Sequence, residues 1–97
     1  MIIEVAELRI DPQRSAEFEA AIVRGVTTVI ANAKGFLGYE VIRGIESPGR
    51  VLLQIRWETV ENHTLDFRQS PAFEQWRAIV GEFFISPPQV EHFSVVA

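Results

Sequence analysis

Two proline-marked helix starts, Asp11-Pro12 and Ser70-Pro71, divide this chain into strand and helix segments and so restrict the folds open to it. Asp and Ser side chains accept hydrogen bonds from free amides at the beginning of a helix. Proline fits the first helical turn because no amide donor is needed there. We therefore expect one helix over residues 12–34 and another over 71–84.

The segments between these helices have the composition of strands. β-Branched and aliphatic residues dominate four stretches, which are 2–10, 36–46, 51–57 and 89–96. Ser47-Pro48-Gly49 supplies a turn between the two middle strands and predicts a hairpin. A short helix over 59–69 precedes the last helix. The order β-α-β-β-α-β, with the second helix broken in two, predicts a ferredoxin-like α+β fold with an antiparallel sheet.

The chain is short enough to form only one hydrophobic core, so we expect a single domain over residues 1–97. It has no cysteine, and disulfides therefore contribute nothing to its stability. Strands 2–10 and 51–57 carry apolar residues on both alternate sets, whereas helices can cover only one face of such a sheet. Pairing of the uncovered faces predicts a homodimer, in which two chains form a dimeric α+β barrel.

Charge and hydropathy exclude several classes of partner. The net charge is −4, and the nine Lys and Arg residues are scattered along the chain, so we expect no nucleic acid partner. The first ten residues alternate and carry acidic groups, which is unlike a signal peptide, and no apolar run is long enough to span a bilayer. We expect a cytoplasmic protein that has no membrane partner.

The stretch from Trp57 to Phe93 resembles the second half of the antibiotic biosynthesis monooxygenase family, and IIEVAELRIDPQRSAEFEAAI is similar to its first strand and helix. The distinctive features are Trp57 at the end of its strand, Ser70-Pro71, Phe73 and Trp76. The resemblance implies a homodimer with a pocket for a small molecule. Known members include cofactor-independent oxygenases of aromatic polyketides, haem-degrading enzymes and a small-metabolite isomerase.

This chain departs from two patterns within that family. The haem-degrading branch uses an Asn on the first strand, a Trp late in the short helix and a His in the next helix. Here the first strand has no Asn, Phe67 occupies the helix position, and residues 74–80 contain no His. Many other members carry a His where this chain has Phe67, whereas His63 lies one turn earlier. We expect no haem and no other cofactor.

His63 is the candidate general base. It shares a helix face with Val60, Thr64 and Phe67, so its imidazole should point inward, and burial should keep it neutral at pH 7. A histidine that only satisfies a nearby carbonyl in the core is the alternative. His92 lies on the last strand, where either a subunit contact or the pocket would accommodate it.

Aromatic side chains are the candidate walls of a dry substrate pocket. Tyr39 and Arg77 are candidates for binding an oxyanion. Each ring has plain core packing as its alternative. The candidate wall residues are Trp57, Phe67, Trp76, Phe83 and Phe84.

The sequence contains no motif for metal binding, nucleotide binding or nucleophilic catalysis. Two histidines 29 positions apart lack metal-ligand spacing, and no nucleotide-binding or nucleophile motif occurs. The sequence therefore favours a cofactor-independent monooxygenase that acts on a small aromatic, quinol or polyketide-like substrate with dioxygen. A small-molecule-binding or isomerase-like protein that performs no oxidation is the alternative.

Overall fold

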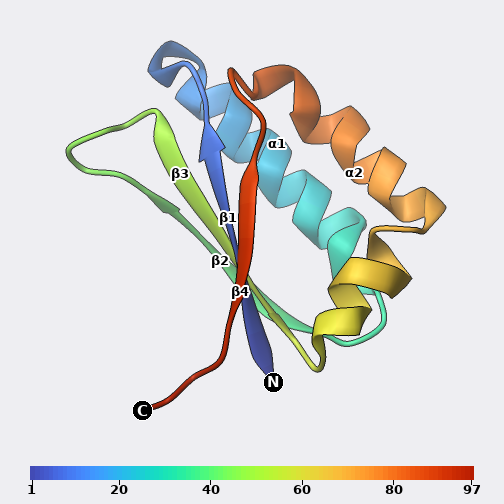
Figure 1. Ribbon diagram of the computed structural model, residues 1–97. Helices are drawn as coiled ribbons and strands as arrows, with labels where there is room; N and C mark the ends of the chain where they lie inside the picture. The colour runs from blue at the N-terminus through green and yellow to red at the C-terminus, as the bar shows by residue number, and fades with distance from the viewer.

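The chain forms a four-stranded antiparallel sheet with both main helices on one face (Figure 1). The computed structural model describes all residues from Met1 to Ala97. The sheet order β2-β3-β1-β4 confirms the ferredoxin-like α+β class. No helix combines the length and apolar character that a bilayer span requires. The elements are β1 (Ile2–Arg9), η1 (Pro12–Arg14), α1 (Ser15–Thr28), η2 (Ile30–Asn32), β2 (Phe36–Arg43), β3 (Arg50–Trp57), η3 (Asn62–Phe67), α2 (Pro71–Val80), η4 (Gly81–Phe83) and β4 (Gln89–Phe93).

The first helical region begins as expected but is divided into η1, α1 and η2. The side chain of Asp11 accepts a hydrogen bond from the Gln13 amide at 2.9 Å and caps the start. The hydroxyls of Thr27 and Thr28 donate to backbone carbonyls of the preceding turn, at 2.8 and 2.6 Å. These bonds and the β-branched run after Gly25 weaken the regular helix at its end. Gly35 then adopts a left-handed conformation, with φ at 84°.

Two strands are shorter than the sequence predicts. The hairpin between β2 and β3 is confirmed, but β2 ends at Arg43 because the Gly44 amide already bonds the Arg50 carbonyl at 2.8 Å to close the loop. β4 ends at Phe93, which pairs with Ile3 at the start of β1. The β1–β4 pairing ends there, so residues 94–96 are not part of the strand, because backbone pairing is what defines a strand.

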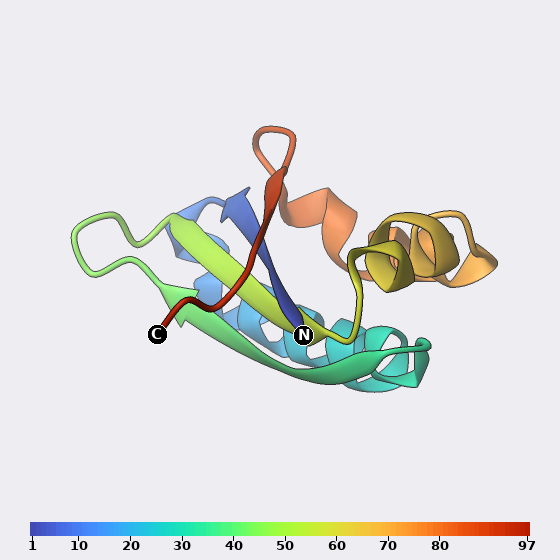
Figure 2. The same cartoon turned by 60° about the horizontal axis from the view of Figure 1, so that its bottom comes forward.

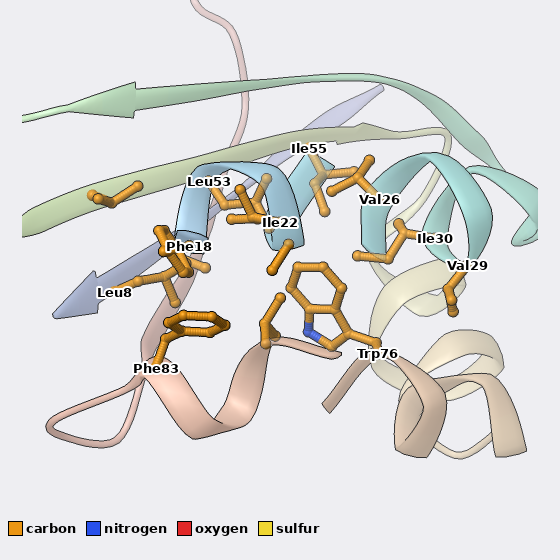
Figure 3. Packing of buried hydrophobic residues seen from close by; sticks show 14 of the residues in the cluster. Leu8, Phe18, Ile22, Val26, Val29, Ile30, Leu53, Ile55, Trp76 and Phe83 are labelled. Carbon is orange, nitrogen blue, oxygen red and sulfur yellow. The ribbon is translucent and has the colours of Figure 1, made fainter. Parts of the chain in front are cut away.

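One hydrophobic core lies between the sheet and the helices (Figure 3). The inward-facing residues of β3, which are Val51, Leu53, Ile55 and Trp57, are all buried, as their alternation predicts. Trp76 projects from α2 towards α1, and a Cβ atom placed on Gly25 would lie 2.8 Å from its ring. The missing side chain of Gly25 therefore lets α1 and α2 pack closely around the indole.

Candidate active site

The segment after β3 aims His63 into the molecule. The Thr59 amide donates to Asn62 Oδ1, and the Asn62 amide donates to Thr59 Oγ1, both at 3.1 Å, so the two residues cap the turn reciprocally. The Arg68 amide then bonds the His63 carbonyl at 2.9 Å, five residues back, which is the spacing of a π-helical turn. π-Helical turns are rare and are frequent at functional sites. In both ribbon views this turn lies beside α2 (Figure 2).

A cavity of about 590 Å³ lies between the sheet, this turn and α2. Its volume falls within the range of pockets that hold small molecules. Eleven of its nineteen lining residues are hydrophobic. Besides those, the lining includes Glu4, His63, Arg68, Arg77 and Ser86.

Glu4, His63 and His92 form a polar cluster at the sheet wall of this cavity. Glu4 and His92 are direct partners in the β1–β4 register, so their side chains leave the same face of the sheet. His63 Nδ1 lies 2.8 Å from His92 Nε2, and His63 Nε2 lies 3.4 Å from Glu4 Oε1. The indole of Trp57 donates to the same Glu4 oxygen at 2.9 Å. We call this set the Glu4–His63–His92 cluster.

Both ring nitrogens of His63 therefore face other protein groups. Its ring is also stacked on Trp57, with the centroids 5.7 Å apart, and lies 6.5 Å from Phe67. Only 4% of His63 is exposed. By contrast, Glu4 Oε2 has no hydrogen-bond partner. Every fully buried side-chain oxygen in the protein does have such a partner. Glu4 Oε2 is therefore not fully buried, and Glu4 lines the cavity.

Burial disfavours the charged form of each group in the cluster. Loss of water raises the pKa of Glu4 to about 7, against the opposing effects of the Trp57 hydrogen bond and the Arg68 charge. Burial, with the Arg68 and His92 charges, lowers the pKa of His63 to about 4. This direction agrees with the neutral imidazole expected from the burial of His63. Burial and Arg68 also lower the pKa of His92. A proton shared by Glu4 and His63 thus resides on the carboxyl.

Five of the nine residues that the sequence offered for the site line the cavity. They are His63, Phe67, Trp76, Arg77 and Phe84. The guanidinium of Arg77 lies 6.0 Å from the centre of the Phe73 ring, another lining residue. Its charge is therefore held at the cavity wall by an aromatic face.

The other four, Tyr39, Trp57, Phe83 and His92, do not line the cavity. Tyr39 is on the distant edge strand β2, and Phe83 packs against Phe18 on the side of α1, with the ring centroids 5.6 Å apart. Trp57 is completely buried and His92 lies behind His63, so both contact the cavity wall without reaching the cavity itself. Periodicity indicates which face of an element is buried, but it cannot tell the core from a cavity.

Glu4 and Arg68 are site residues that the sequence argument did not identify. Glu4 shares its alternate set on β1 with Ile2, Ala6 and Leu8, which are apolar. A carboxylate on the inward face of a strand is rarely buried without a role, and this was the available signal. Arg68 follows the π-helical turn and carries no sequence signal of its own. No group of three or more His, Asp or Glu side chains has an arrangement that could hold a metal ion.

Comparisons with known proteins agree with this architecture. The family model described as antibiotic biosynthesis monooxygenase matches residues 1–79. The uncharacterized protein YczJ of Bacillus subtilis (strain 168) is 35% identical over 96 residues, which are 99% of this chain and all of that protein.

Two solved structures extend the comparison. A Bordetella bronchiseptica protein with the provisional name antibiotic biosynthesis monooxygenase is 44% identical, with a TM-score of 0.93 over 99% of this chain and 97% of the other. A monooxygenase from the gene ActVA-Orf6 of Streptomyces coelicolor, solved with Nanaomycin D, has a TM-score of 0.83 at 17% identity. The match covers 99% of this chain and 88% of the other. At that identity the likeness concerns the fold.

Proposed function

Because the chain belongs to the antibiotic biosynthesis monooxygenase family, we propose that it is a cofactor-independent monooxygenase that oxidises a small aromatic, quinol or polyketide-like substrate with dioxygen. The observation that carries the proposal is a largely apolar cavity with a buried carboxyl–imidazole pair in its wall. The Streptomyces coelicolor monooxygenase, whose structure contains a small molecule, supports a ligand site in this fold.

Such a reaction needs a substrate that becomes electron-rich when it loses a proton. In an anthrone, a ring methylene loses one proton to a base, and the resulting anion can pass electrons to dioxygen. The methylene becomes a carbonyl, and the second oxygen atom leaves as water with the two methylene hydrogens. The substrate supplies all the electrons, so no external reductant is needed. The cavity contributes a group that accepts protons, an apolar wall and the charges of Arg68 and Arg77 near the developing anion.

Oxygen uptake tests the proposal directly. The purified protein, incubated with a panel of anthrones and quinols and without added flavin, haem or metal, should consume dioxygen faster than the same solutions without protein. The His63→Ala variant should lose this uptake because it opens the cluster and removes the group that contacts Glu4. Tight binding of these compounds without any uptake would instead favour the alternative of a ligand-binding or isomerase-like protein.

We also propose that the sheet face opposite the helices binds a second copy of the chain. Directly paired residues share a face, so the β-ladder places several apolar side chains on this surface together. Ile42 and Phe93 are 42% and 48% exposed, although both are large and apolar. The charged residues Glu40, Arg56 and Glu91 lie among them and are able to specify the pairing. The apolar members are Ile3, Val5, Ile42, Leu52 and Phe93.

Light scattering should therefore give a mass near twice the 11.0 kDa of one chain. Leu52→Glu places a charge on the inner strand β3, beside Ile42, and should shift the protein towards the monomer, because burying an unpaired charge is costly. Glu74→Gln, on the exposed side of α2, is the matched control and should remain dimeric. A wild-type protein that stays monomeric at micromolar concentration would contradict the proposal.

A further inference from the structure

We infer that Glu4, rather than His63, removes the proton from the substrate, and that His63 and His92 are positioning residues that hold its carboxyl group. The inference rests on the proposed function and assigns the roles within its site. It changes the role that the sequence suggested for His63, from general base to hydrogen-bonding support.

The geometry leaves an oxygen of Glu4 available to a substrate. A general base must reach the proton that it accepts, within hydrogen-bond distance. The nitrogens of His63 are turned towards other protein groups: Nδ1 contacts His92 at 2.8 Å, and Nε2 lies 3.4 Å from Glu4 Oε1 without forming a hydrogen bond. Glu4 Oε1 is also occupied, by the Trp57 indole. Glu4 Oε2 is unpartnered, and the residue lines the cavity while only 5% exposed.

The tautomers of the two histidines follow from this arrangement. If the His63 proton is on Nε2, it points at Glu4 Oε1, and Nδ1 accepts a hydrogen bond from the Nε2–H of His92. Trp57 donates a hydrogen bond to Glu4 Oε1 at 2.9 Å, and the His63 ring faces the same oxygen at 3.4 Å. Both rings are buried and packed, so the carboxyl group cannot rotate without losing these contacts. Its second oxygen is thereby kept towards the cavity.

The charges around Glu4 favour its role as a base near neutral pH. The groups that face it are Trp57 on β3, His63 on η3 and His92 on β4, with the cations Arg68 and Arg77 at the cavity wall. Burial raises the pKa of Glu4 to about 7, where a general base is most effective at physiological pH. His63, with a pKa lowered to about 4, is a weaker base than Glu4 in the same cluster.

The proposed step is a simple proton transfer. The acidic C–H or O–H bond of the substrate breaks, the proton moves to Glu4 Oε2, and the electron pair stays on the substrate as an anion. That anion then reduces dioxygen. The carboxyl returns its proton when the peroxide formed on the substrate releases water, so Glu4 ends the cycle as it began.

The dependence of kcat/KM on pH tests the assignment, because the two candidate bases titrate in different ranges. With Glu4 as the base, oxygen uptake by the wild type should rise with pH through about 7. Glu4→Gln should lower kcat by about 10² to 10⁴-fold and remove this rise.

His63→Gln keeps an N–H donor towards Glu4, so it should retain the rise and much of the activity. His63→Leu removes the donor, so it should move the midpoint to higher pH. Glu74→Gln, exposed on α2, is the control and should match the wild type.

Opposite results would overturn the assignment. Uptake that is level around pH 7 and falls only through about 4, with His63→Gln inactive and Glu4→Gln active, would make His63 the base. A separate measurement needs no turnover. The Glu4 carboxyl carbon, followed by NMR in the wild type, should titrate near pH 7, and titration at its ordinary value would also overturn the inference.

Absence of oxygen uptake with every substrate would refute the proposed function. In that case, absorbance of bound 4-nitrophenol still distinguishes a phenolate formed by wild type from a neutral phenol bound by Glu4→Gln.

Discussion

Replacing Trp76 with alanine should lower the free energy of unfolding by about 3 to 5 kcal/mol, as large aromatic deletions in protein cores do. Only 8% of the residue is exposed, and its indole packs against α1 at Gly25 and forms part of the cavity wall. The neighbouring helix has no side chain at Gly25 that could move into the space. The void would therefore stay open and join the cavity, and the lost contacts would not be replaced.

Urea unfolding at a fixed protein concentration measures this change. Trp76→Phe retains part of the packing and should cost less than alanine. Gln75→Ala, on the exposed side of the same helix, is the matched control and should remain within about 0.5 kcal/mol of the wild type. A loss below about 1 kcal/mol for Trp76→Ala would contradict the placement of the indole between the two helices.

Glu4 and His63 should make the stability of the protein depend on pH in opposite directions. The folded protein raises the pKa of Glu4 from 4.5 to about 7, so it holds a proton that the unfolded chain releases in this range. The contribution of Glu4 is complete below pH 4.5 and is lost as the pH rises through about 7. From the size of the shift, the loss is about 3 kcal/mol.

His63 has the reverse effect, because its pKa falls from 6.5 to about 4 on folding. Its contribution is complete above pH 6.5 and is lost as the pH falls through about 4, again by about 3 kcal/mol. The two effects oppose each other between pH 4.5 and 6.5, and the wild type should change little there on their account.

Urea unfolding of single variants over a pH series separates the two contributions. The stability of the wild type relative to Glu4→Gln should decrease by about 3 kcal/mol as the pH rises from 4.5 to 7. Relative to His63→Gln, it should increase by a similar amount between pH 4 and 6.5. Two pH-independent differences would show that neither group is held uncharged by burial in the folded protein.

The class of fold was accessible from local patterns because each pattern has a local cause. Asp11-Pro12 and Ser70-Pro71 mark helix starts in any context that allows a helix. The alternation in β3 required one buried face, and the structure buries it. The ends of a strand depend on its pairing with neighbouring strands that are distant in the sequence. The predicted strands β2 and β4 were therefore too long. Ser70 shows the same limit, since its hydroxyl donates to the Phe67 carbonyl and makes no capping bond.

The sequence by itself determined the order of strands and helices, the inward direction of His63 and the burial of Trp76, because spacing along one helix fixes which side chains share a face. Only the tertiary structure decided which buried groups meet. The β1–β4 register brings together Glu4 and His92, which are 88 positions apart, and the π-helical turn places His63 against both. The periodicity of the sequence does not predict the contact of Glu4 with His63 and His92, because this contact depends on pairing between distant segments. The proposal that Glu4 rather than His63 is the base rests on these contacts, since the pKa of a buried group is set by its surroundings in space.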